Sequence, residues 1–219
     1  MNLVIVTKLN SIGWWSAILA GGFGIVYSVF QILSTLKLIP HPRDMFWLFT
    51  PSLLLAPAFL VAMICLHYYA NNKVKLYTAV AVAFAILYCA DVSLVYFTQL
   101  FVILPAQLNN QIAEKQVLLF DRKTFLEAID CLGYFFMSLS TLFAAFSFAN
   151  DEKNQWMYRG LLFNGLLLPV LILAFFYPAF YYVGALWMIT FPLAMINVAR
   201  LFHGDALPSV KMKFKYENQ

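Results

Sequence analysis

Six long runs of apolar residues constrain this chain more than any other feature. Each run reaches the roughly 20 residues that an α-helix needs to cross the hydrocarbon core of a bilayer. The runs cover residues 11–36, 47–69, 76–104, 125–148, 156–177 and 180–202. Hydrophobic residues make up 63% of the chain and charged residues 11%, against about 45–50% and about 25% in a soluble domain. The sequence therefore predicts a single, all-α transmembrane domain, a bundle of six membrane-spanning helices.

The segments between the runs carry the residues that end helices. "KLIPHPRD", "NNKVK" and "NDEKN" follow the first, second and fourth runs, and they combine proline, asparagine and charge. The fifth and sixth runs are separated only by "YPAFYY", whose aromatic rings suit the membrane interface. The longest connection, residues 105–124, mixes apolar and charged residues without clear periodicity. Three interpretations stay open for it: a short interfacial helix, a segment folded over the end of the bundle, and a solvated connector.

The basic residues predict an orientation. With six spans, the amino terminus, the second and fourth loops and the carboxyl tail share one side of the membrane. That side has nine of the 14 Lys and Arg residues, and the other side has five. Because basic residues concentrate on the cytoplasmic side, we expect both termini in the cytoplasm. The tail "VKMKFKYENQ" contributes three of the nine, and we interpret it as a topology anchor.

Two aspartates interrupt the apolar runs. Asp91 stands near the middle of the third run, about 20 Å from its outer end, and Asp130 stands about 8 Å into the fourth. No Lys or Arg lies at the depth of Asp91. An ionised carboxylate at the bilayer centre costs several kcal/mol (order of magnitude). Asp91 is therefore expected to hold its proton or to pair with an imported cation, such as a metal ion, a relayed proton or a ligand amine.

Helical spacing places other polar residues beside these acids. Positions three, four or seven residues apart share a helix face, which groups Tyr134 with Asp130, and Tyr88 with Asp91. The predicted ligand or proton site is drawn from Asp91, Asp130, Tyr88, Tyr134, Thr98, Gln99, Thr141, Gln31 and Asn164. The alternative is that these side chains are hydrogen-bonding glue between helices.

The sequence lacks the residue patterns of a disulfide framework, a metal site, a serine hydrolase and a nucleic-acid-binding protein. The isolated cysteines Cys65, Cys89 and Cys131 all fall inside predicted spans, so neither a disulfide framework nor a zinc site is expected. The three histidines lie in separate segments without metal-ligand spacing, so we expect no metal and no cofactor. The serines of "MSLST" have no histidine base near them in sequence. The net charge of +4 lies in loops and tail, which is not typical of a nucleic-acid partner.

Three stretches carry a resemblance: "AIDCLGYFFMSLSTLFAAFSF", "LFNGLLLPVLIL" and "ALWMITFPLAMINVARLF". With them the chain resembles a group of uncharacterised six-span bacterial integral membrane proteins, classed as a domain of unknown function. The resemblance covers nearly the whole chain. It implies a compact, multi-pass six-helix bundle in the bacterial cytoplasmic membrane. It implies no activity and assigns no site residue.

Three functions from different classes remain open. The first is a membrane protein that binds or transports a small molecule or ion, with Asp91 as the central polar group and Asp130 nearer the mouth. The second is a non-catalytic accessory or assembly protein that packs against a membrane partner or a second copy; the aromatic fraction of 18% supplies packing surface. The third is a membrane-embedded enzyme, which the lack of a nucleophile with its base disfavours.

Overall fold

The computed structural model describes residues 3–204, and these form helices without any strand. The carboxyl tail and its predicted anchor lie outside the described residues. The α-helices are α1 (Leu3–Thr35), α2 (Arg43–Tyr69), α3 (Lys75–Thr98), α4 (Leu104–Leu108), α5 (Phe125–Phe146), α6 (Gln155–Gly165), α7 (Leu168–Phe176), α8 (Phe180–Gly184) and α9 (Trp187–Gly204).

Six helical segments within this range are long and apolar enough to cross a membrane. They are Thr7–Thr35, Arg43–Tyr69, Asn72–Leu108, Phe125–Phe146, Glu152–Ala174 and Phe180–His203. The predicted all-α architecture with six membrane-length helices is thereby confirmed. Each segment overlaps one of the predicted runs, and the third extends four residues beyond its run at either end, from Asn72 to Leu108.

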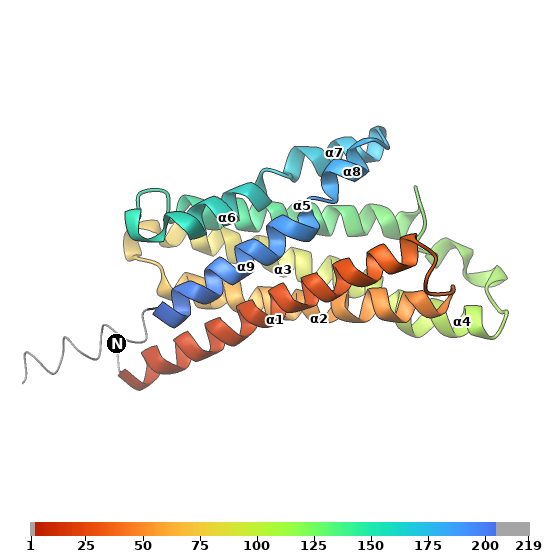
Figure 1. Cartoon of the computed structure of the whole chain (residues 1–219), viewed down its shortest axis with the longest axis horizontal. Helices are drawn as coiled ribbons and strands as arrows, with labels where there is room; N and C mark the ends of the chain where they lie inside the picture. Colours follow the sequence, from red (N-terminus) through yellow and green to blue (C-terminus); the bar gives the residue numbers. More distant parts are fainter. Residues whose placement is uncertain (1–2, 205–219) are drawn as a thin grey trace, which may run out of the picture.

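The long helices pack as a closed ring along the long axis of the molecule (Figure 1). Around the ring, α1 contacts α2, α2 contacts α3, α3 contacts α5, α5 contacts α6, α6 contacts α9, and α9 returns to α1. The amino terminus and the α2–α3 and α5–α6 turns gather at one end, which we call the amino-terminal end. The α1–α2 loop and α4 lie at the other, which we call the α4 end.

Glycine residues set the distance between some of the helices. A Cβ atom at Gly165 would lie 2.8 Å from the Cβ of Leu142 and 2.9 Å from its Cα. A Cβ at Gly133 would lie 2.8 Å from Cγ1 of Val92. Glycine at these positions allows close contact of α5 with α6 and with α3, as small residues do in membrane bundles.

The fifth and sixth spans are each interrupted, which the sequence analysis did not predict. The fifth divides into α6 and α7, and the sixth into α8 and α9. Pro169 stands in the first turn of α7, where its missing N–H costs no helical hydrogen bond. The α7–α8 hairpin projects from the bundle (Figure 1). It is fastened to α5 by the Tyr181 hydroxyl, which donates a 2.8 Å hydrogen bond to Oε1 of Glu127.

The third span changes its winding before it ends. After α3 the chain makes a π-helical turn, Gln99–Ile103, and continues into α4, where Pro105 cannot donate a backbone hydrogen bond. In a regular α-helix, Gln107 would be rotated by about 80° from Gln99. A π-turn rotates the chain less per residue than an α-helix does. This smaller rotation brings Gln107 onto the same face as Gln99. Both side chains line the cavity described next.

Candidate functional site: a cavity at the α4 end

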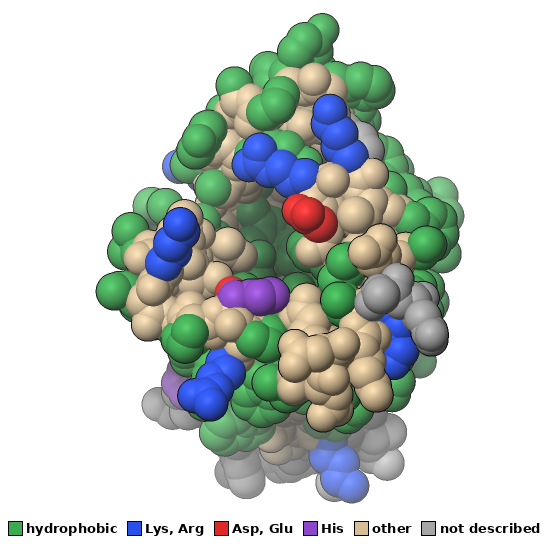
Figure 2. All heavy atoms as spheres, turned by 90° about the vertical axis from the view of Figure 1, so that its right-hand side faces the viewer, with side chains coloured by type: hydrophobic (Ala, Val, Ile, Leu, Met, Phe, Trp, Pro, Cys, Tyr) green, Lys and Arg blue, Asp and Glu red, His purple; other side chains and the backbone are tan. Residues whose placement is uncertain are grey.

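A cavity of about 260 Å³ opens at the α4 end of the bundle. Figure 2 faces this end and shows a hollow with a hydrophobic floor, bordered by charged side chains. Five of the lining residues are apolar: Met45, Leu48, Phe49, Leu119 and Phe120. Eight carry polar atoms: Tyr27, Gln31, His41, Asp44, Tyr96, Gln99, Gln107 and Asp130. The volume is just below the range of about 300–1,000 Å³ typical of drug-sized ligand sites, so the cavity suits a small molecule.

Asp130 is the acid in the interior of this cavity. Its side chain is only 8% exposed, and its Oδ1 has no hydrogen-bond partner among the described residues. The Tyr96 hydroxyl interacts with the Asp130 carboxyl group and lies 3.0 Å from the Tyr134 hydroxyl. The lining residues include neither Lys nor Arg. The carboxyl group therefore lacks a countercharge within the part of the chain that the structure describes.

Four aromatic residues line the cavity together with Asp130: Tyr27, Phe49, Tyr96 and Phe120. Tyr27 from α1 packs edge-on against Trp187, with ring centroids 5.8 Å apart. Phe49 stacks on Tyr96 at 5.6 Å. Faces of such rings attract cations, and the attraction strengthens when water is excluded. An acid and aromatic rings in one cavity are a combination that suits a cationic ligand.

The connection between the third and fourth spans closes part of this end. Gln99 holds it: Nε2 donates to the carbonyl oxygen of Leu118 at 2.8 Å, and Oε1 accepts from the backbone N–H of Phe120 at 3.2 Å. Of the three interpretations, the structure therefore supports a segment folded over the end of the bundle. The amide nitrogen of Gln99 is used as a donor and its amide oxygen as an acceptor, so this predicted ligand residue has a structural role.

The cavity mouth contains a pair that the sequence analysis did not select. His41 Nδ1 lies 3.1 Å from Asp44 Oδ1, and the Ser34 hydroxyl donates to Asp44 Oδ2 at 2.7 Å. Asp44 thus ties the α1–α2 loop to the start of α2. Nearby, the predicted residue Gln31 accepts a 3.0 Å hydrogen bond from the Tyr27 hydroxyl through Oε1.

Gln107 is a further lining residue that the sequence analysis did not select. Its Oε1 is buried and has no hydrogen-bond partner among residues 3–204. Helical periodicity could not select it, because the π-turn shifts the face on which it lies. The cavity thus contains two side chains, Gln107 and Asp130, that each keep a buried oxygen acceptor unused.

Asp91 lies outside the cavity, on the flank of α3 beside α5. Its Cβ is 3.4 Å from the position of a Cβ on Gly133, its side chain is half-buried, and it is not among the lining residues described. The polar residues of the third run do not share one face of α3. Tyr88 and Gln99 are buried in the core, whereas Asp91 and Thr98 are only half-buried. Positions 88 and 91 differ by about 60° around a helix, enough to move a side chain from core to flank. Asp130, rather than Asp91, is therefore the central acid.

Two further predicted residues form a separate polar network. Asn164 Nδ2 donates to the Thr141 hydroxyl, and the Thr190 hydroxyl donates to Asn164 Oδ1, both at 3.1 Å. The network joins α5, α6 and α9 and is the hydrogen-bonding glue of the alternative interpretation. The Ser140 hydroxyl of "MSLST" likewise donates to the carbonyl of Ala81 at 2.7 Å. Thr98 donates to Leu94 of its own helix at 2.7 Å.

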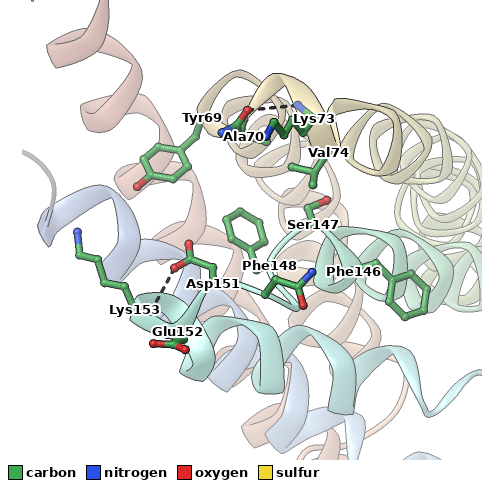
Figure 3. Close-up of a pocket in the computed structure, with 12 residues that line it drawn as sticks. Tyr69, Ala70, Lys73, Val74, Phe146, Ser147, Phe148, Asp151, Glu152 and Lys153 are labelled. Carbon is green, nitrogen blue, oxygen red and sulfur yellow. Dashed lines mark hydrogen bonds between the residues drawn. The ribbon is translucent and has the colours of Figure 1, made fainter.

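A wider hollow of about 940 Å³ lies at the amino-terminal end, between the α2–α3 and α5–α6 turns (Figure 3). Two of its polar side chains hold the turns, although the buried Ser147 hydroxyl has no hydrogen-bond partner among the described residues. Asn71 accepts from the backbone N–H of Lys73, and Asp151 accepts from that of Lys153, each at 3.2 Å. These bonds cap the short 3₁₀ turns that precede α3 and α6. The cavity at the α4 end is consequently the better candidate for a ligand site.

Comparison with known proteins adds no family. A scan against protein-family models, a search of curated proteins and a search of solved structures each find no match to this chain. The resemblance to six-span bacterial membrane proteins therefore stays a prediction.

Proposed function

We propose that this chain is an integral membrane protein that binds a small cation, organic or inorganic, in the cavity at the α4 end. Asp130 is the residue that pairs with the positive charge. The observation that supports this most directly is its buried, unpartnered Oδ1 in a cavity lined by neither Lys nor Arg. Acids within membrane spans pair with a partner or mark the path of a ligand or ion.

The interaction draws its strength from the surroundings of Asp130. A charge pair in a medium of low dielectric constant attracts more strongly than in water. A buried carboxylate without a countercharge is costly, so a cation that enters the cavity offsets that cost. Aromatic rings in the same cavity add attraction for the same charge.

Binding from the α4 end requires no movement of the core. Beyond Asp130 the bundle is filled by Tyr88, Phe59 and Met137, each at most 1% exposed. Transport through the bundle would require these side chains to move. With both termini in the cytoplasm, as the basic residues predict, the cavity opens on the outer face of a bacterial cytoplasmic membrane.

The purified full-length protein in nanodiscs tests the proposal by calorimetric titration with a panel of inorganic and organic cations. We expect at least one cation to bind, and Asp130→Asn to weaken it at least tenfold, equivalent to about 1.4 kcal/mol. The matched control is Asp91→Asn, which removes the other intramembrane acid outside the cavity and should leave affinity unchanged. Equal affinity in the Asp130→Asn variant would defeat the proposal.

One observation favours a second function, packing against a membrane partner. The α7–α8 hairpin projects from the ring (Figure 1) and exposes Phe176 and Tyr182, with 72% and 84% of each residue accessible. An accessory protein would bury these side chains against its partner. Photo-crosslinking from position 182 in native membranes tests this, with position 15 on the α1 surface as the control. Crosslinks specific to position 182 support the function, and equal labelling at both positions speaks against it.

A further inference from the structure

We infer that the ligand is a small, hydrophobic amine with at least two N–H donors on its cationic nitrogen, bound between Asp130 and Gln107. This inference rests on the proposed function and narrows its class of ligand. It uses a residue on α4 that the proposed function does not need. The inference follows from counting which polar atoms of the cavity are already used.

Two oxygen atoms remain unused. Oδ1 of Asp130 and Oε1 of Gln107 are buried without a partner among the described residues, and both side chains line the cavity. The other amide oxygens are occupied: that of Gln31 accepts from Tyr27, and that of Gln99 accepts from Phe120. The site therefore offers two acceptors, one of them a carboxylate, to a ligand that donates hydrogen bonds.

This pair of acceptors separates the classes of cation. An ammonium group with two or more N–H bonds has a donor for each of the two oxygens, and charge-assisted bonds of this kind are the strong ones. A quaternary ammonium has no N–H and would leave both acceptors unsatisfied. A hard metal ion such as Ca²⁺ takes about 6–8 oxygen ligands, more than the cavity leaves unused.

The other lining residues and the cavity volume determine the polarity and size of the part of the ligand beyond its amine. Phe49, Phe120, Leu48, Leu119 and Met45 form apolar walls, so the body is hydrophobic. A cavity of about 260 Å³ holds roughly nine water molecules at the volume of the liquid, which is room for a single ring with a short chain. A free carboxylate on the ligand would find neither Lys nor Arg among the lining residues. The class is therefore an amine and not an amino acid.

The test titrates four probes into the full-length protein in nanodiscs: 2-phenylethylamine, its trimethylammonium analogue, 2-phenylethanol and phenylalanine. We expect 2-phenylethylamine to bind at least tenfold more tightly than each of the others. Gln107→Leu should weaken the amine at least tenfold, and so should Asp130→Asn. The controls are Asp91→Asn and Gln111→Leu, a glutamine exposed at the same end, and both should bind as the unaltered protein does.

The outcomes distinguish the two proposals. If the trimethylammonium probe binds as tightly as the amine, or if Gln107→Leu leaves the affinity for the amine unchanged, the inference is overturned while cation binding at Asp130 stands. If none of the four probes and none of the inorganic cations binds, both proposals are overturned. The comparison of methylated and unmethylated probes uses the unaltered protein, so it decides the inference even if a variant fails to fold.

Discussion

Asn164 lies in the interior of the bundle with both ends of its amide occupied by threonine hydroxyls. Asp130, on the neighbouring helix, is also buried but keeps one carboxylate oxygen unused. A satisfied polar group holds helices together, whereas an unsatisfied one is costly unless something from outside the chain binds it. The two residues therefore differ in how fully their polar atoms are hydrogen-bonded, although both are polar residues inside predicted spans.

Replacement of Asn164 by Leu should destabilise the bundle. The Thr190 hydroxyl loses its acceptor, and we expect a loss of about 1 kcal/mol, since hydrogen bonds between membrane helices average about 0.6 kcal/mol and an orphaned group adds to that. Thermal unfolding in detergent, followed by circular dichroism, measures the change. Thr98→Val is the control, because that hydroxyl bonds only to its own helix. Equal melting temperatures for both variants would show that the Asn164 network contributes nothing.

Only part of the site could be predicted from residues alone. The sequence indicates Asp130 because a charged residue within an apolar run is unusual whatever its neighbours. Asp91 satisfied the same criterion and yet lies beside Gly133 on the flank of α3. Spacing along one helix fixes which residues share a face, but packing of α3 against α5 decides which face borders the cavity. That contact is long-range and leaves no local pattern.

At the scale of elements, the π-turn explains why Gln107 escaped notice. Regular periodicity extrapolated from α3 assigns Gln99 and Gln107 to different faces, and the turn at Gln99–Ile103 brings them together. Pro105 was visible in the sequence, and proline is a frequent cause of such irregularities. The residue at which the irregularity begins, however, depends on the contacts of the whole segment.

Close packing of α5 against α6 gives the second prediction of stability. In Gly165→Ala, the new Cβ would meet backbone atoms of Leu142, its Cα at 2.9 Å and its nitrogen at 3.0 Å. Because backbone cannot rotate away as a side chain can, the helices must separate. We expect a loss of about 1–3 kcal/mol, as for other overpacked sites, measured by the same thermal unfolding.

Gly22→Ala is the matched control for this change, because a Cβ at Gly22 has nothing within 4 Å. The higher helix propensity of alanine, up to about 1 kcal/mol, should make this variant neutral or slightly more stable. The two substitutions are chemically identical, so opposite signs isolate the effect of the close contact. A gain in stability for Gly165→Ala would mean that α6 can shift without loss.

At the scale of the whole molecule, the bilayer makes the architecture predictable. In lipid each backbone polar group must be satisfied within the protein, so long apolar runs become helices. The six spans follow from that requirement. The order of helices around the ring does not, because lipid-facing and core-facing surfaces are both apolar here. The projecting α7–α8 hairpin was missed for the same reason: an apolar run does not reveal where it leaves the bundle.

The distribution of basic residues along the sequence gives the last prediction. Nine of the 14 Lys and Arg residues belong to segments that the sequence assigns to the side of the termini, and five belong to segments assigned to the opposite side. The positive-inside rule therefore predicts that the cavity mouth faces the outside of the cell. Asn72 and Gln111 are exposed at opposite ends and are uncharged, so cysteine at either position leaves the charge balance intact.

In a background with Cys65, Cys89 and Cys131 replaced by alanine, a membrane-impermeant maleimide added to intact spheroplasts should label Gln111→Cys. It should label Asn72→Cys only after the membrane is opened. The reverse pattern would place the cavity mouth in the cytoplasm. An amine that binds between Asp130 and Gln107 would then have to come from inside the cell, so the same labelling experiment decides on which side the ligand must be sought.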